Sequence, residues 1–175
     1  MKTELHHVVL VGPMGAGKST VGRLLARNLG RPFLDLDTAI EQHTGKCIPE
    51  LFETAGEPSF RDIEQRLGIQ LLDTTEGCVL ATGGGAVLSA DFRRRCLHPD
   101  VLSIYLAVSA DEALRRIGWN PAASRPLLAT EDPAARWNLL LSEREALYRQ
   151  CARTVRTDGR EPKDIAAEIA RELQS

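Results

Sequence analysis

The chain has 175 residues, of which 43% are hydrophobic and 26% charged, and its formal net charge is −2. A chain of this size and composition is expected to form one globular domain, residues 1–175, that buries a core without disulfide bonds. The charge favours neither nucleic acid nor acidic membranes, and no apolar run approaches the roughly 20 residues of a membrane-spanning helix. We therefore expect no nucleic acid and no membrane among its partners.

The N-terminal stretch does not follow a signal-peptide pattern, because Glu4, His6 and His7 lie where an uninterrupted apolar core would be needed. We therefore expect a cytoplasmic protein. The cysteines include no C-x-x-C pair and the histidines no metal-binding helix pattern, so all four cysteines are interpreted as small apolar residues. Three consecutive arginines, residues 93–95, form a local basic cluster that we expect on a solvated helix face.

Short β-branched and apolar runs alternate with segments of helical periodicity along the chain. In chain order, we expect strands at residues 7–11, 33–37, 78–81, 101–108 and 154–156. The expected helices are residues 20–29, a helix that starts at 38–42, and residues 48–55, 60–72, 110–117, 134–151 and 165–173. Parallel neighbours need crossover connections, so this alternation predicts an α/β fold with a parallel sheet covered on both faces.

Two segments rich in glycine and proline interrupt this pattern. Gly56-Glu57-Pro58 separates two of the helical stretches. Residues 118–126 contain a glycine, an asparagine and two prolines, which exclude regular structure there. We predict a mobile lid over about residues 118–132.

The most specific motif is Gly12-Pro13-Met14-Gly15-Ala16-Gly17-Lys18-Ser19, which matches G-x-x-x-x-G-K-[ST] between a predicted strand and a predicted helix. In such a loop, backbone N–H groups surround nucleotide phosphates, Lys18 contacts the β- and γ-phosphates, and Ser19 binds Mg²⁺. We expect the nucleotide to be held by Gly15, Ala16, Gly17, Lys18, Ser19 and Thr20. A chance glycine turn is the alternative. The motif also leaves open whether water, a hydroxyl or a partner protein receives the phosphoryl group.

Several polar residues could form the acceptor side. Asp35 and Asp37 lie two apart at the end of the second strand, so one could serve Mg²⁺ and the other an acceptor hydroxyl. Alternatively, Asp37 caps the next helix. Residues 83–85 are all glycine, which permits close approach of a ligand but also suits a tight turn. Anion-binding arginines are candidates too, although the chain is rich in arginine and each could equally lie on the surface: Arg61, Arg125 and Arg144.

Six motifs in chain order resemble those of shikimate kinase: G-P-M-G-A-G-K-S-T at 12–20, D-L-D at 35–37, L-F-E-T-A-G-E-P-S-F-R at 51–61, A-T-G-G-G-A-V at 81–87, S-R-P-L-L at 124–128 and R-E-A-L-Y at 144–148. The resemblance spans nearly the whole chain. Many NTPases share the first motif, whereas the others in this order are much more specific. The resemblance implies a nucleoside-monophosphate-kinase-like fold, three layers α/β/α, whose five-stranded parallel sheet has the order 2-3-1-4-5.

The resemblance also implies how shikimate is bound. Asp37 would contact the ring hydroxyls and act as the base at the 3-hydroxyl, while Arg61 and Arg144 would bind the carboxylate. Gly83, Gly84 and Gly85 would line the pocket. Its apolar walls would be Phe52 and Phe60, and an acceptor-binding helical segment would cover about residues 38–65.

On the nucleotide side, the resemblance implies that Ser19 and Asp35 serve Mg²⁺. Arg125, carried by the lid, would neutralise charge on the transferring phosphoryl group. The residues that would border the adenine are Arg116, Arg160 and Pro162.

The expected activity is therefore the ATP- and Mg²⁺-dependent phosphorylation of shikimate to shikimate 3-phosphate, a step of chorismate and aromatic amino acid biosynthesis, by a monomer. Two alternatives stay open. One is another small-molecule kinase of the same fold, acting on gluconate or a nucleotide. The other is a nucleotide-binding switch that regulates a partner and turns over slowly.

Overall fold

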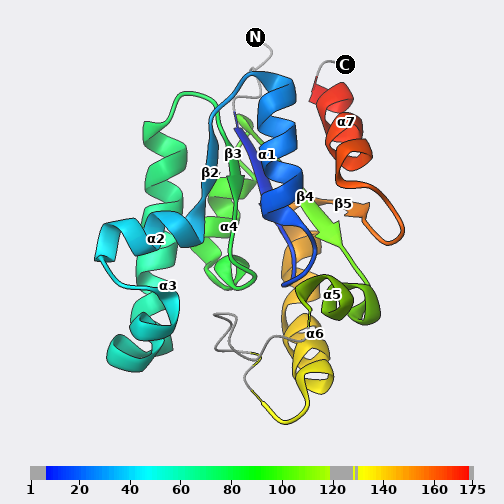
Figure 1. Cartoon of the computed structure of the whole chain (residues 1–175). Coiled ribbons are helices and arrows are strands. Elements are labelled where there is room, and N and C mark those ends of the chain that lie inside the picture. The colour runs from blue at the N-terminus through cyan, green and yellow to red at the C-terminus, as the bar shows by residue number, and fades with distance from the viewer. Residues whose placement is uncertain (1–6, 119–127, 129, 174–175) are drawn as a thin grey trace.

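A computed structural model describes residues 7–118, 128 and 130–173. Five strands form one sheet in the order β2-β3-β1-β4-β5, and every neighbouring pair is parallel. The strands are β1 His7–Val11, β2 Phe33–Asp35, β3 Val79–Ala81, β4 Val101–Ala107 and β5 Arg153–Arg156. The predicted fold and strand order are confirmed (Figure 1).

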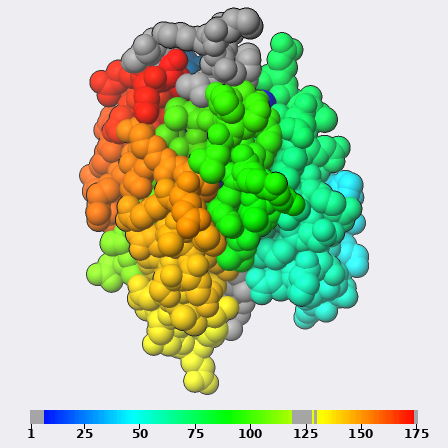
Figure 2. All heavy atoms as spheres, turned by 180° about the vertical axis from the view of Figure 1, so that it is seen from behind, coloured from blue at the N-terminus to red at the C-terminus, as the bar shows by residue number. Residues whose placement is uncertain are grey.

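Helices cover both faces of the sheet. Helices α1 and α7 lie in front of it in Figure 1, and the view from behind in Figure 2 shows α4 and α6 side by side on the opposite face, with α3 next to them. The helices are α1 Lys18–Leu29, α2 Leu36–Thr44, α3 Ile48–Thr74, α4 Ala90–Cys96, α5 Ala110–Ile117, α6 Pro133–Cys151 and α7 Pro162–Leu173, with a 3₁₀ turn η1 at Ala86–Leu88. The result is the three-layer architecture that the alternation of elements predicted.

The central strand β1 explains how the two faces are held. Its alternate side chains point in opposite directions, so Val8 and Leu10 pack toward α1 and α7, while Val9 and Val11 pack toward α3 and α4. All four are fully buried. Burying a side chain of this size stabilises the fold by about 1.5–3 kcal/mol, so this strand anchors both layers and fixes the start of the loop that follows it.

The second strand is shorter than predicted. The Asp35 carboxylate accepts hydrogen bonds from the backbone N–H groups of Asp37 and Thr38, at 3.1 and 3.3 Å, and thereby caps α2. The prediction that residues 33–37 form one strand, with both aspartates on one side of it, is wrong for Asp37, which lies in the first turn of the helix. The alternative that Asp37 is the cap is also wrong, because Asp35 takes that position.

Helix α3 contains the predicted break. Gly56 has φ 78° and ψ 165°, which is not a helical conformation, and Pro58 follows it, so two helical segments meet there at a kink. The kink separates the part of α3 that carries Phe52 from the part that carries Phe60 and Arg61. The rings of Phe52 and Phe60 still meet across it, with centroids 4.7 Å apart.

Two surface predictions need correction. In the arginine cluster of α4, Arg94 is exposed, but the Arg95 side chain is only 14% exposed and pairs with Asp73 and Asp100. The solvated face therefore does not include all three arginines. The interpretation of all four cysteines as small apolar residues suits Cys78, Cys96 and Cys151, which are buried, but not Cys47, which is exposed. None of the helices in the described part of the chain is long and apolar enough to span a membrane.

Candidate active site

The loop between β1 and α1 has the shape of a phosphate-binding loop. Gly15 has φ 82°, and a Cβ atom placed on it would lie 2.6 Å from the Ala113 carbonyl oxygen of α5. Gly17 caps α1 in a left-handed conformation, φ 88°. A side chain at Gly15 would collide with backbone, and L-residues disfavour both conformations, which is why glycine is needed there. The loop thus ends at the N-terminus of a helix, where an anion is favoured.

Lys18 lies inside the curve of this loop. Its ammonium donates to the carbonyl oxygens of Gly12 and Pro13, at 2.8 and 2.9 Å, and the residue is 9% exposed. The contacts keep the charge close to the loop's concave side. The motif's prediction that a cation faces the phosphate site agrees with this geometry.

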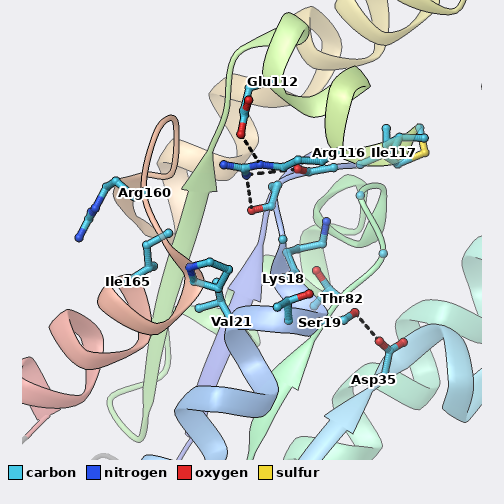
Figure 3. Close-up of a pocket in the computed structure, with 18 of the residues that line it drawn as sticks. Lys18, Ser19, Val21, Asp35, Thr82, Glu112, Arg116, Ile117, Arg160 and Ile165 are labelled. Atoms are coloured by element: carbon cyan, nitrogen blue, oxygen red, sulfur yellow. Dashed lines mark hydrogen bonds and ion pairs between the residues drawn. The ribbon is translucent and has the colours of Figure 1, made fainter. Parts of the chain in front are cut away.

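Ser19 and Asp35 meet at the base of the loop. The Ser19 hydroxyl donates to the Asp35 carboxylate at 2.6 Å, as Figure 3 shows. One hydroxyl and one carboxylate oxygen suit Mg²⁺, which binds few protein ligands and keeps water and phosphate oxygens. The described residues contain no cluster of three or more His, Cys, Asp or Glu side chains that could hold a metal by themselves. The donors present therefore fit a nucleotide-associated Mg²⁺ ion rather than an all-protein metal cage.

A cavity of about 500 Å³ opens beside the loop. One end is lined by the phosphate loop, by Arg116 and Ile117 of α5, and by Arg160 and Pro162 before and at the start of α7 (Figure 3). The other end is lined by acidic and small residues at the ends of the strands: Asp35, Asp37, Thr82, Gly83 and Gly84. The cavity therefore joins the predicted nucleotide site to the predicted acceptor site at the carboxyl ends of the strands, where open parallel sheets bind ligands.

Arg116 has a structural task that the sequence did not reveal. It pairs with Glu112 at 2.8 Å and donates to the side chain and backbone carbonyl of Thr157 at 3.0 and 2.8 Å. It also reaches the Gly15 and Ala16 carbonyls at 3.4 and 3.5 Å. Its place on the cavity wall agrees with the predicted adenine border, but that role stays a prediction, as do those of Arg160 and Pro162.

Asp37 faces the cavity from the first turn of α2. Although the carboxylate is open to the cavity, surrounding protein atoms partly desolvate it, and this effect, followed by the nearby charge of Asp35, raises its pKa. Lys18 and Arg61 oppose the rise. A carboxylate in these surroundings is stabilised when it accepts a proton or a hydrogen bond from a hydroxyl. A base at an acceptor hydroxyl does both.

The glycine turn after β3 brings the acceptor residues together. A Cβ atom on Gly83 would lie 2.6 Å from a Glu64 carboxylate oxygen and 3.1 Å from one of Asp37. On Gly85 it would overlap the Arg61 guanidinium, whereas on Gly84 it would meet Arg144 only at 3.7 Å. The predicted acceptor residues therefore lie close around the backbone of this turn, which leaves no room for side chains at Gly83 and Gly85.

Two guanidinium groups lie near this glycine turn. Arg144 is 5% exposed, and its Nε atom has no hydrogen-bond partner among the described residues. Burial, and to a lesser degree the nearby positive charge of Arg61, lowers the Arg144 pKa. Burial acts to lower the Arg61 pKa as well, but the carboxylates of Glu64 and Glu57 have the larger combined effect and raise it. Two partly desolvated cations close together favour an anion, and a carboxylate satisfies both.

Glu64 is a site residue that sequence reasoning missed. It is 1% exposed, and one of its oxygens accepts from Arg61 Nη1 at 2.6 Å. Burial raises its pKa, with the Arg61 charge opposing this. Its other oxygen has no partner within the described part of the chain and lies beside Gly83. The three-residue spacing from Arg61 was the available signal, but it does not tell a buried pair from an exposed one.

The structure does not place the predicted aromatic walls or the predicted lid at the cavity. Phe60 is buried and Phe52 only partly so, and neither lines the cavity described above. Arg125 lies outside the described residues, as does most of the predicted lid. The roles assigned to these three residues stay predictions.

Comparisons with known proteins show the family of the chain. A family model described as shikimate kinase matches residues 14–174. The shikimate kinase of Rhodococcus erythropolis is 45% identical over 167 residues, 95% of this chain and 96% of that protein. That of Rhodopseudomonas palustris is 51% identical over 148 residues, 85% of this chain and 71% of that protein.

Solved structures give the same result. Shikimate kinase from Acinetobacter baumannii in complex with shikimate has a TM-score of 0.89 at 39% identity, covering 98% of this chain and 94% of that one. A deoxyadenosine kinase from M. mycoides, at 18% identity and a TM-score of 0.60, shares the fold alone. Since the family model covers most of the chain and the relatives exceed 40% identity over nearly all of it, this chain belongs to the shikimate kinase family.

Proposed function

We propose that the protein transfers the γ-phosphoryl group of ATP to the 3-hydroxyl of shikimate, giving shikimate 3-phosphate and ADP. The observation that carries the proposal is the continuous cavity that runs from the phosphate loop to Asp37 and the glycine turn, with Arg61 and Arg144 around that turn. The family to which the chain belongs supports the same reaction.

In the proposed reaction, Asp37 accepts the proton of the 3-hydroxyl while the oxygen of that hydroxyl bonds to the γ-phosphorus. The bond from that phosphorus to the bridging β,γ oxygen breaks, and its electron pair leaves with ADP. The raised pKa of Asp37 supports this role, because it makes the carboxylate a better proton acceptor than an ordinary aspartate. Lys18 and the loop N–H groups hold the phosphates in place and balance their negative charge.

Shikimate's carboxylate is proposed to bind the two cations beside the glycine turn. Arg61 and Arg144 come from α3 and α6, and the partly desolvated state of both supports binding of an organic anion. Gluconate is also a carboxylic acid, but it is an open chain. A cyclic polyol such as shikimate holds its carboxylate and its hydroxyls in fixed relative positions, and so fits two cations and one carboxylate held on rigid elements.

A Mg²⁺ ion is proposed to accompany ATP. Ser19 and Asp35 would hold it, directly or through water, and it would neutralise charge on the β- and γ-phosphates. The short hydrogen bond between these two side chains supports this, since it keeps two oxygen donors together at the foot of the loop.

Three coarser features complete the proposal. Residues 38–65 form the acceptor-binding segment, which is supported by the positions of Arg61 and Glu64 near its end. Residues 118–132 form the lid, with Arg125 acting on the phosphoryl group. We also propose that the protein works as a monomer in the cytoplasm. The monomer is supported because the described residues of one chain line both the nucleotide end and the acceptor end of the cavity.

A coupled assay of ATP consumption with Mg²⁺ tests the proposal. Shikimate is expected to stimulate ADP formation far more than gluconate or AMP at equal concentration. Equal rates with all three would remove the assignment. ADP formation that is slow, independent of any acceptor and followed by tight retention of ADP would instead identify a nucleotide-binding switch.

A further inference from the structure

The backbone carbonyl groups of the phosphate loop are held by side chains from three different helices. Lys18 of α1 binds the Gly12 and Pro13 carbonyls, and Arg116 of α5 reaches those of Gly15 and Ala16 at longer distances. The carbonyl between them, that of Met14, accepts a hydrogen bond of 2.9 Å from the indole N–H of Trp137 in α6. Each carbonyl from residue 12 to residue 16 therefore has a donor.

Trp137 is well placed to hold its partner still. The residue is 1% exposed, and its ring belongs to the core cluster that also contains Ala16 of the loop and Ala113 of α5. A ring packed on all sides does not rotate freely, so its N–H points in one fixed direction. The hydrogen bond joins residues 123 positions apart in the chain.

The consequence for the nucleotide follows from the geometry of one peptide group. The Met14 carbonyl and the Gly15 N–H belong to the same planar trans peptide, so they point in opposite directions. The carbonyl points to the Trp137 ring, which does not line the cavity, so the N–H points the opposite way, toward the cavity that Gly15 lines and where the phosphates are proposed to bind. Gly15 has φ 82°, and glycine alone offers little resistance to rotation of this peptide.

We propose that Trp137 is a positioning residue for phosphate binding, acting through the Met14 carbonyl to orient the Gly15 N–H. The proposal rests on the proposed use of ATP but not on the identity of the acceptor. Trp137 does not touch the substrate in this account. Its effect is to keep one loop donor pre-oriented, so that ATP or ADP need not order the loop when it binds.

The test removes the indole N–H while an aromatic ring stays at position 137. Trp137→Phe removes the donor, and β-(3-benzothienyl)alanine at position 137 removes it with nearly the same volume. Both are expected to weaken ADP binding, measured by calorimetry, about two- to tenfold, the range expected for a neutral hydrogen bond. KM for ATP should rise similarly, while KM for shikimate at saturating ATP and kcat change less than twofold.

Leu140→Ala is the matched control, because Leu140 is also buried in α6 but its apolar side chain makes no hydrogen bond. It should lower the melting temperature and leave ADP affinity unchanged. If the benzothienyl protein binds ADP like the unmodified chain, or if Leu140→Ala weakens ADP binding equally, Trp137 is only a core residue and the proposal is wrong. An unmodified chain that binds ADP but does not phosphorylate shikimate would refute the proposed function and leave this test intact.

Discussion

Alanine substitutions at the neighbouring positions Gly84 and Gly85 should have very different effects on shikimate binding. A Cβ atom on Gly85 would overlap the Arg61 guanidinium, which Glu57 and Glu64 hold in place at 3.1 and 2.6 Å. A Cβ atom on Gly84 would meet its nearest neighbours at 3.5–3.7 Å, an ordinary contact. Gly85 has φ −101°, so alanine there adds no backbone strain and its effect comes from the collision alone.

The magnitude follows from the bond that Arg61 is proposed to make. Moving its guanidinium away from shikimate's carboxylate removes a hydrogen bond to a charged group, worth about 1.5–3 kcal/mol. This corresponds to a rise in the shikimate KM of roughly ten- to a hundredfold for Gly85→Ala. Gly84→Ala should stay within about threefold of the unmodified chain, since no charged hydrogen bond is lost.

The assay is a coupled measurement of initial rates at saturating Mg-ATP over a range of shikimate concentrations. KM for ATP serves as the internal control and should not change in either variant. Arg61 does not line the cavity beside the phosphate loop, and a Cβ atom on Gly84 would make only an ordinary contact, 3.5 Å, with the Gly12 carbonyl oxygen of that loop. An unchanged shikimate KM in Gly85→Ala would refute the reasoning. Equal losses in the two variants would do so as well, because the turn would then be generally intolerant of side chains.

Three further predictions concern the base, the metal and the fold. Asp37→Asn should reduce kcat by at least a hundredfold while ADP affinity, measured by calorimetry, stays within about threefold; a normal kcat would show that Asp37 is not the base. Chelation of Mg²⁺ should abolish turnover, and Ser19→Ala should raise the Mg²⁺ concentration needed for half-maximal rate; unchanged Mg²⁺ dependence would remove Ser19 from the metal site. Although burial opposes it, hydrogen bonding to Arg95 and His98 lowers the Asp100 pKa to about 2. A lowered pKa adds stability above the carboxyl's usual pKa that is lost as pH falls toward 2, so Asp100→Asn should cost about 1–2 kcal/mol at pH 7, after allowance for solvent screening. The loss should shrink as pH falls through that window in urea unfolding, and a loss independent of pH would contradict the assignment.

The phosphate loop and the sheet were predictable because their signals are local. The loop motif fixes its own conformation, since glycines allow the bends and the flanking strand and helix have clear periodicities. Strand order is not encoded in any one segment, and it came from the resemblance to a family. Helix α4 was expected only through its arginines, without bounds, because it has just seven residues and three of them are arginine.

The errors arose where side chains compete with periodicity. Asp35 and Asp37 alternate like strand residues, but the Asp35 carboxylate binds two backbone N–H groups and starts a helix one residue later. Glu64 and Trp137 look like an ordinary helix residue and an ordinary core residue. Their tasks depend on Arg61 and Met14 being brought to them by the fold, and Met14 is 123 positions from Trp137. Contacts of this kind become visible only in three dimensions.

Identification of the reaction product tests the central claim most directly. After incubation with Mg-ATP and shikimate, ¹H–³¹P correlation NMR is expected to show a new phosphate monoester whose phosphorus couples to the proton on carbon 3 of shikimate, in equal amount to the ADP formed. Inorganic phosphate as the only new phosphorus signal besides those of ADP, or an ester on another hydroxyl, would contradict transfer to the hydroxyl that Asp37 is proposed to activate.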